Sequence, residues 1–150
     1  MKKTILLALA VALTALLLTA CGGGGPKEYV DGTYTAQSEM YTAEEEGEGD
    51  GYGVVTLTIS GGKITGCEFI TYQPDGTVKD EEYGKAVNGE VGNPDFYNKA
   101  QKAVKAAPVY AEQLVETGSL DQVDAISGAT YNYQQFKDAV DTALQQAEKK

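Results

Sequence analysis

The sequence contains no histidine, no arginine and no tryptophan, and only two of its 150 residues are cysteines. Without imidazole or guanidinium groups, the chain cannot form a Ser-His-Asp triad, a histidine-ligated metal site or an arginine clamp on phosphate. Twelve lysines stand against 22 acidic residues, which gives a formal net charge of −10. Because this charge repels a phosphate backbone, we expect no nucleic-acid partner. The length suits one small domain and excludes two large ones.

The N-terminal segment has the order of charged and apolar residues that is typical of a secretion signal. Two lysines precede an apolar run that is short for a membrane span and ends at residue 20. The following junction, Leu-Thr-Ala-Cys at 18–21, resembles a bacterial lipobox, in which the cysteine becomes the mature N-terminus and carries lipid. We therefore predict a lipoprotein signal peptide at residues 1–20 and lipidation of Cys21. Since two or more acyl chains make a stable anchor, we expect a lipid-anchored protein on the extracytoplasmic side of the cell membrane.

The chain after the signal peptide reads as a spacer followed by one domain. Residues 21–27 comprise the lipidated cysteine and a glycine-rich spacer, and the domain is placed at residues 28–150. Loss of the signal peptide removes two lysines and no acid, which changes the formal net charge from −10 to −12. Cys67 then has no disulfide partner in the chain, and we expect it to be a small buried apolar side chain.

An acidic segment at residues 43–53 reads as a surface loop. Its carboxylates do not fit the spacing of an EF-hand, because a loop with Gly51 at the sixth position has Leu57 at the twelfth. Calcium needs a bidentate glutamate there. We therefore expect no metal site in this segment.

Strand patterns fill the first half of the domain. Residues 33–36 form a short β-rich stretch, and in residues 55–59 apolar side chains alternate with threonines as in a half-buried strand. The Ser-Gly-Gly-Lys sequence at 60–63 suits a tight turn, and residues 64–72 return as the partner strand. The pattern predicts a β-meander.

The second half has helical spacing. Asn93 and Pro94 have the residue types of an N-cap and a first turn, and the helix that follows is predicted to be interrupted by Pro108. A second helical piece is predicted to end at Gly118, and a capping box at Asn132 predicts the start of the last helix. Strands followed by helices indicate an α+β fold, with a small antiparallel sheet packed against helices from the C-terminal half.

Residues 124–130 read Asp-Ala-Ile-Ser-Gly-Ala-Thr and carry the chemistry of the chain. They match the Asp-x-x-(Ser/Thr)-Gly-Ala-Thr motif of the FMN-binding domain family, which the sequence resembles. The resemblance extends in the same order to the segments at 31–34, 51–53, 62–65 and 136–140. It implies that a flavin transferase attaches FMN to Thr130 through a phosphoester bond.

The residue types of the motif suit a tethered phosphate. Gly128 and Ala129 lack bulk, so backbone amides can approach a phosphate, and the start of the next helix offers free N–H groups. Ser127 can donate a hydrogen bond to a phosphate oxygen, while Asp124 either orients the Thr130 hydroxyl or is recognised by the attaching enzyme. These five residues are the predicted cofactor site. In the alternative interpretation, they form a polar loop whose side chains cap helix ends.

The tyrosines supply candidates for contact with the isoalloxazine ring. Tyr52, Tyr83 and Tyr131 could stack on it, whereas Tyr133 lies on the apolar stripe of the last helix and is predicted to be in the core. The chain departs from the family pattern in two places, since Tyr131 follows the attachment residue and residues 71–74 lack the Glu-Thr pair of many members. The ring contacts are therefore left open.

The resemblance implies a membrane-anchored flavoprotein that relays electrons from a membrane redox donor to extracellular acceptors. The absence of an obvious acid–base pair favours an electron carrier over an enzyme with a dedicated substrate. A non-catalytic surface lipoprotein, which binds a ligand or partner with its motif unmodified, is the alternative. The released signal peptide also resembles pheromone precursors, which makes a peptide signal a third hypothesis.

Overall fold

The computed structural model describes residues 27–42 and 49–150. The predicted signal peptide, Cys21 and the acidic run at 43–48 lie outside these residues. In the described part of the chain, no helix has the length and apolar character needed to cross a membrane. The elements follow in the order β1 (Gly32–Gln37), β2 (Tyr52–Ser60), β3 (Lys63–Tyr72), α1 (Pro94–Thr117), the 3-10 turn η1 (Leu120–Gln122) and α2 (Thr130–Ala147).

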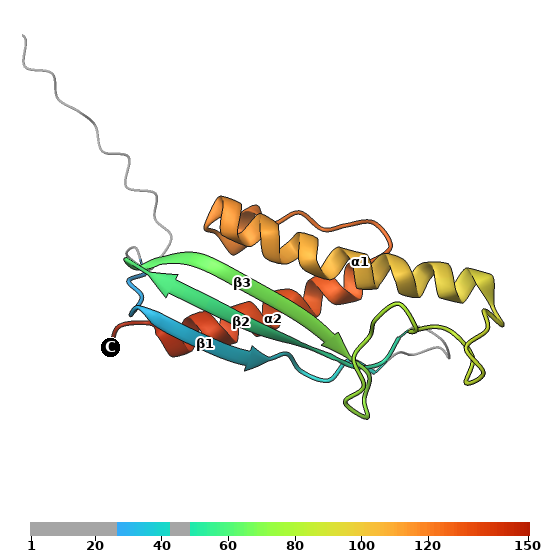
Figure 1. The fold of residues 1–150 in the computed structure, drawn as a ribbon. Helices are drawn as coiled ribbons and strands as arrows, with labels where there is room; N and C mark the ends of the chain where they lie inside the picture. The colour runs from blue at the N-terminus through green and yellow to red at the C-terminus, as the bar shows by residue number, and fades with distance from the viewer. Residues whose placement is uncertain (1–26, 43–48) are drawn as a thin grey trace, which may run out of the picture.

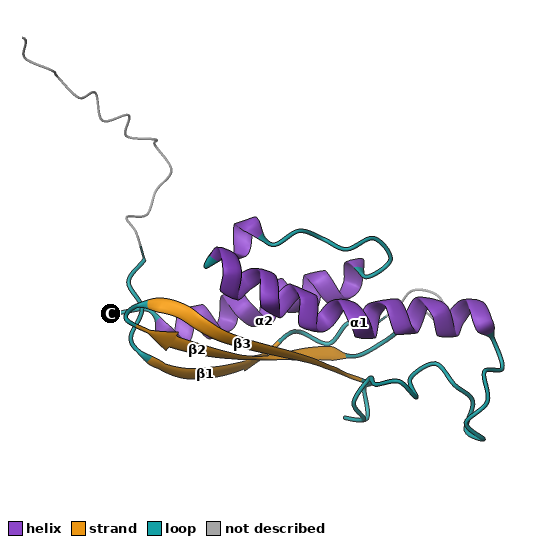
Figure 2. Ribbon diagram, turned by 45° about the horizontal axis from the view of Figure 1, so that its top comes forward, coloured by secondary structure: helices purple, strands orange, loops and turns teal. Residues whose placement is uncertain are grey.

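The three strands form an antiparallel sheet in the order β1-β2-β3, and both long helices lie on one of its faces (Figures 1 and 2). This arrangement confirms the predicted α+β fold and its meander. The turn at 60–63 is also confirmed, because Gly61 and Gly62 adopt the positive φ values of 60° and 70° that a tight turn requires. The Asp31 carboxylate accepts both of their backbone N–H groups at 2.9 Å and thereby fixes the turn.

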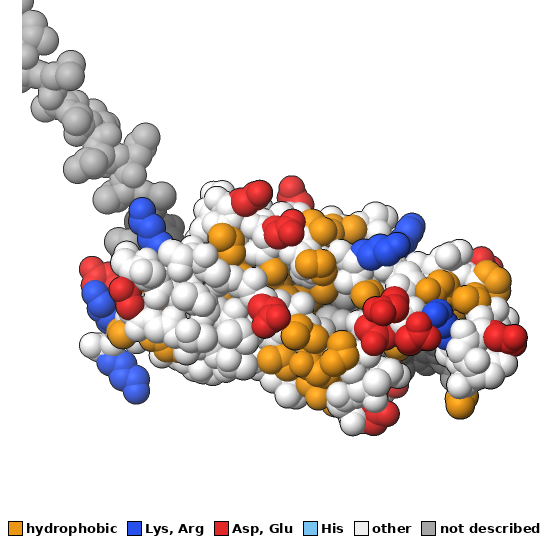
Figure 3. Space-filling model, viewed as in Figure 1, with side chains coloured by type: hydrophobic (Ala, Val, Ile, Leu, Met, Phe, Trp, Pro, Cys, Tyr) orange, Lys and Arg blue, Asp and Glu red, His pale blue; other side chains and the backbone are white. Residues whose placement is uncertain are grey.

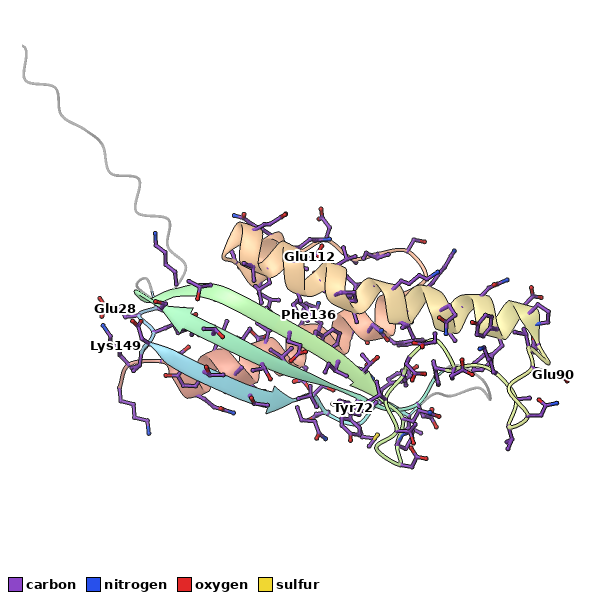
Figure 4. The ribbon with its side chains drawn as sticks, in the orientation of Figure 1. Glu28, Tyr72, Glu90, Glu112, Phe136 and Lys149 are labelled. Carbon is purple, nitrogen blue, oxygen red and sulfur yellow. The ribbon has the colours of Figure 1, made fainter. Side chains whose placement is uncertain are left out.

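The core lies between the sheet and the helices. Alternation along β2 turns Val55 and Leu57 toward the helices, where neither has any solvent exposure. From α2, Phe136 packs its ring edge against the ring of Phe69 at 5.0 Å and stacks on Tyr110 of α1 at 5.7 Å. Figure 4 shows Phe136 between the ribbons of the two layers. This cluster holds both helices on the sheet.

The two ends of the sheet differ in what they carry. At one end, which we call the terminal end, the start of the described domain meets its C-terminal residues: Tyr29 bridges to Glu148, and Glu28 pairs with Lys149 at 2.9 Å. Lysine side chains gather at this end of the surface in Figure 3. The other end, where Tyr72 closes β3, is the cavity end (Figure 4). The candidate site lies there.

Two predictions about the helices are wrong. Pro108 does not interrupt α1, which runs unbroken from residue 94 to residue 117. The missing N–H of proline forfeits one hydrogen bond, but buried alanines on both sides of it, such as Ala107 and Ala111, keep the helix packed on the core. By contrast, the predicted N-cap Asn93 is confirmed, and so is Gly118 as the left-handed C-cap.

The N-cap of the last helix lies three residues earlier than predicted. Thr130 is its first residue and Ala129 is its N-cap, so the capping box at Asn132 does not form. The Asn132 side chain is buried and donates to the Ala103 carbonyl of α1 at 2.8 Å. Gln135 likewise donates to the Gly51 carbonyl at 2.9 Å. Both side chains serve tertiary contacts in place of a cap.

Candidate functional site

A cavity of about 240 Å³ opens at the cavity end, where the loop after β3 and the first half of α1 meet the start of α2. Helix α1 supplies an apolar wall, made of Phe96, Ala100, Ala103 and Val104. The opposite side is polar and includes Thr71 and Lys79. A flat apolar group with polar substituents would match this division.

The motif loop borders the cavity in a fixed conformation. Gly128 has a φ of 83°, which favours glycine over every residue with a Cβ. The phenol of Tyr110, buried in α1, accepts from the Ile126 N–H at 3.1 Å and donates to the Ala129 carbonyl at 3.2 Å. A hydrogen bond from Ala129 N–H to the Ile126 carbonyl at 3.0 Å closes the turn. The rigid core thus holds the loop that precedes Thr130.

Helix α2 points its N-terminus at the cavity. Thr130 lines the cavity and is solvent-exposed at the first position of the helix. Its N-cap, Ala129, has no side-chain oxygen to accept from the N–H groups of the first turn. Such N–H groups and the positive end of the helix dipole favour an anion such as phosphate.

Lys79 is the cation of the polar side, and its side chain is only 6 % exposed. Its Nζ donates to the Gly49 carbonyl at 3.0 Å and lies 5.0 Å from the centre of the Tyr83 ring. Burial lowers the pKa of Lys79 from 10.5 to about 8, and the Asp50 carboxylate opposes part of this shift. The cavity therefore has a positive group that is largely removed from water.

No motif of the sequence singles out Lys79. The lysine is brought to the cavity because the chain turns after β3 and pairs back on it, with Lys79 N–H donating to the Thr71 carbonyl at 2.8 Å. The Pro-Asp-Gly turn at 74–76 was a usable signal, since a strand that reverses there places the next residues beside its own end. No pattern in the sequence indicated that this lysine would be buried.

The cavity end also gathers the buried polar side chains of the described residues. They are Ser38, Thr71, Lys79, Asn132 and Gln135. Ser38 Oγ accepts from the Gly53 N–H at 2.9 Å, and Oε1 of Gln135 is buried without a hydrogen-bond partner. Glycine is required beside them, because a Cβ at Gly53 would lie 2.4 Å from the Phe69 ring.

The structure brings three of the five predicted site residues together. Gly128, Ala129 and Thr130 line the cavity, whereas Ser127 and Asp124 are exposed outside its lining. The backbone N–H of Asp124 donates to the Gln113 side chain at 2.7 Å, which fixes the start of the loop. Asp124 and Ser127 thus face solvent.

Of the candidate ring contacts, Tyr83 and Tyr131 line the cavity. Tyr131 stacks on Tyr41 with ring centres 4.2 Å apart. Tyr52 is not in the lining and stacks on Tyr72 instead, at 5.2 Å. The prediction for Tyr133 is confirmed, because it packs against the core and its hydroxyl donates to the Val123 carbonyl at 2.8 Å.

Cys67 is half-buried and packs against the core. Burial raises the pKa of its thiol to about 12. At neutral pH the side chain is therefore a protonated, unreactive thiol.

These features describe a small domain whose cavity suits a planar group with an anionic tail. The sequence matches the FMN-binding domain family over residues 48–145, and the chain belongs to that family. Among solved structures, the CPE2226 protein of Clostridium perfringens is similar, with a TM-score of 0.57 and 23 % identity over 79 % of this chain and 88 % of that one. A protein of Clostridium thermocellum, solved by NMR, is 26 % identical over 79 % of this chain and 92 % of that one, with a TM-score of 0.41. The curated proteins contain no match.

The residues at the cavity fit FMN. The uncapped start of α2 suits the phosphate, and the apolar wall of α1 suits the ring. Lys79 adds a hydrogen-bond donor on the polar side. The domain is therefore a flavin-binding protein.

Proposed function

We propose that the protein carries FMN on Thr130 through a phosphoester bond and relays electrons outside the cell while Cys21 anchors it by lipid. The observation that carries this proposal is the position of Thr130. Thr130 is exposed as the first residue of an uncapped helix and lines the cavity. An attaching enzyme can reach it, and the bound phosphate would stay beside the helix N-terminus.

The attachment needs an activated flavin, which we take to be a flavin phosphoanhydride held by a flavin transferase. Thr130 Oγ forms the new bond to phosphorus as the anhydride bond breaks, and the hydroxyl proton leaves with the departing phosphate. No oxidant or reductant takes part. The first-turn N–H groups of α2 would then hold the phosphate.

Asp124 and Ser127 fit recognition by the transferase. Both side chains are exposed and lie outside the cavity lining, so they are available to a second protein. This position favours enzyme recognition over orientation of the Thr130 hydroxyl as the role of Asp124. The turn at Gly128 places Thr130 between these two exposed residues and the cavity.

FMN, when bound, supplies one- and two-electron transfer, while the chain supplies position and local charge. The proposed donor is a redox component of the membrane, and the proposed acceptors lie outside the cell. Anchoring would confine the carrier near its donor, and Thr130, which lines the cavity, is exposed to solvent.

The test compares the wild-type protein from its own host with Thr130→Ala and with Thr33→Ala. Thr33 is an exposed threonine of β1 and serves as the matched control. We expect flavin fluorescence in a denaturing gel from the wild type and from Thr33→Ala, and none from Thr130→Ala. Fluorescence that persists in Thr130→Ala places the bond elsewhere. Its absence from the wild type supports a surface lipoprotein with an unmodified motif.

A further inference from the structure

Lys79 combines burial, a positive charge and a place in the cavity lining, which no other described lysine does. Lys99 also lines the cavity, but it is exposed on α1. Within residues 27–42 and 49–150, Lys79 Nζ donates a hydrogen bond to a neutral backbone carbonyl, that of Gly49. A desolvated ammonium group is costly to hold, so its position calls for a reason beyond packing.

Charged and aromatic side chains from several segments of the fold lie around Lys79 or line the same cavity. Asp50 and the Tyr83 ring lie beside its ammonium, Lys99 faces the same cavity from α1, and Tyr131 borders it from α2. The Nζ atom lies 3.0 Å from the place where a Cβ on Gly51 would stand, so the backbone confines it. Its location is therefore fixed by the fold.

We propose that Lys79 compensates the negative charge that the flavin gains on reduction and thereby raises the midpoint potential of the bound FMN. The proposal rests on FMN occupying this cavity, as in the proposed function, but not on covalent attachment. Uptake of two electrons from a donor and one proton from solvent adds one negative charge to the ring. A cation in a poorly solvated cavity stabilises that charge more than a surface lysine can.

The same interaction acts in reverse on the lysine. The pKa of Lys79 is about 8 in the flavin-free protein, and a negative flavin favours the protonated amine, so reduction of the flavin raises this pKa. From about pH 8 up to the raised pKa, reduction is then accompanied by uptake of an additional proton at Lys79. The midpoint potential should therefore fall more steeply with pH in this range than just below it.

The experiment measures midpoint potentials of the FMN-loaded protein by absorbance during titration with dithionite and a reference dye. Lys79→Met removes the charge and keeps an apolar chain of similar length, whereas Lys79→Arg keeps the charge. Lys63→Met removes the same charge at the exposed turn of the terminal end. Circular dichroism checks that each variant is folded.

We expect a lower potential in Lys79→Met, and potentials near that of the wild type in Lys79→Arg and Lys63→Met. The steeper fall above about pH 8 should be present in the wild type and absent from both Lys79 variants. An unchanged potential in Lys79→Met, or an equal fall in Lys63→Met, overturns the proposal. The wild-type pH profile tests it even if a variant does not fold.

Failure of the proposed function would look different. Flavin that leaves the denatured wild type disproves the bond to Thr130. In that case, the midpoint potential of noncovalently bound FMN can still be measured in Lys79→Met and in Lys63→Met. The comparison of these two variants decides the role of Lys79 whether or not the flavin is attached to Thr130.

Discussion

The middle of the domain and its cavity end differ in the side chains that they bury. In the middle, Leu57, Leu114 and Phe136 have no exposure and contact other apolar groups. At the cavity end, the buried side chains include polar ones, among them Lys79 and Gln135. The first region stabilises the fold, and the second keeps groups out of water at a cost in stability because they serve a ligand.

The largest expected effect of a single change is in the middle. Phe136→Ala should lower the free energy of unfolding by about 3–5 kcal/mol, because it removes a fully buried ring that contacts Phe69 and Tyr110. Urea unfolding followed by circular dichroism measures this. Val87→Ala, at a fully exposed position, is the control and should change the value by less than about 0.5 kcal/mol. An equal loss in both variants would contradict the assignment of the core.

At the cavity end, by contrast, we expect a substitution that increases the free energy of unfolding. Lys79→Met should raise the free energy of unfolding of the flavin-free protein at pH 7 by about 1–3 kcal/mol, since it removes a desolvated charge. The pKa of Lys79 lies near 8 in the folded protein and at 10.5 when it is solvated. The unfolded chain thus binds more protons between these values, and wild-type stability should rise with pH across them.

Urea unfolding at pH 7, 8, 9 and 10 checks both parts. The difference between wild type and Lys79→Met should shrink as the pH rises. A variant that is less stable than the wild type at pH 7 would mean that the ammonium is compensated in the flavin-free protein.

Alanine substitutions at two glycines should have a smaller effect on stability, and they distinguish a role in the fold from a role in the site. Gly128 and Gly118 both have positive φ, 83° and 67°, so alanine at either should lower the free energy of unfolding by about 1–2 kcal/mol. Only Gly128 borders the cavity. Gly128→Ala should therefore also reduce the flavin retained per protein, measured by absorbance, whereas Gly118→Ala should not. Equal retention in both would remove Gly128 from the site.

The sequence predicted best what local chemistry decides. Alternation along β2 and the caps at Asn93 and Gly118 depend on neighbouring residues, and all three were confirmed. The errors at Pro108 and Asn132 share one cause, because in both places contacts with distant residues outweigh the local preference.

The candidate site likewise contains residues that the local sequence predicts and residues that only the fold brings together. The motif identified the residues that border the cavity from the α2 side, since their spacing is local. Lys79 and the polar neighbours of Gly53 come from segments far apart in the chain, and only the folded sheet brings them to one end. Their burial could not be read from any one segment.

The central claim is tested most directly by locating the flavin in the chain. Trypsin cuts after lysine, so the motif lies in the peptide 106–137, which contains two threonines, Thr117 and Thr130. Fragmentation of this peptide, prepared from protein made in its own host, should place the added mass of the FMN ester on Thr130. An unmodified peptide, or a modification on Thr117 at the far end of α1, would contradict the account.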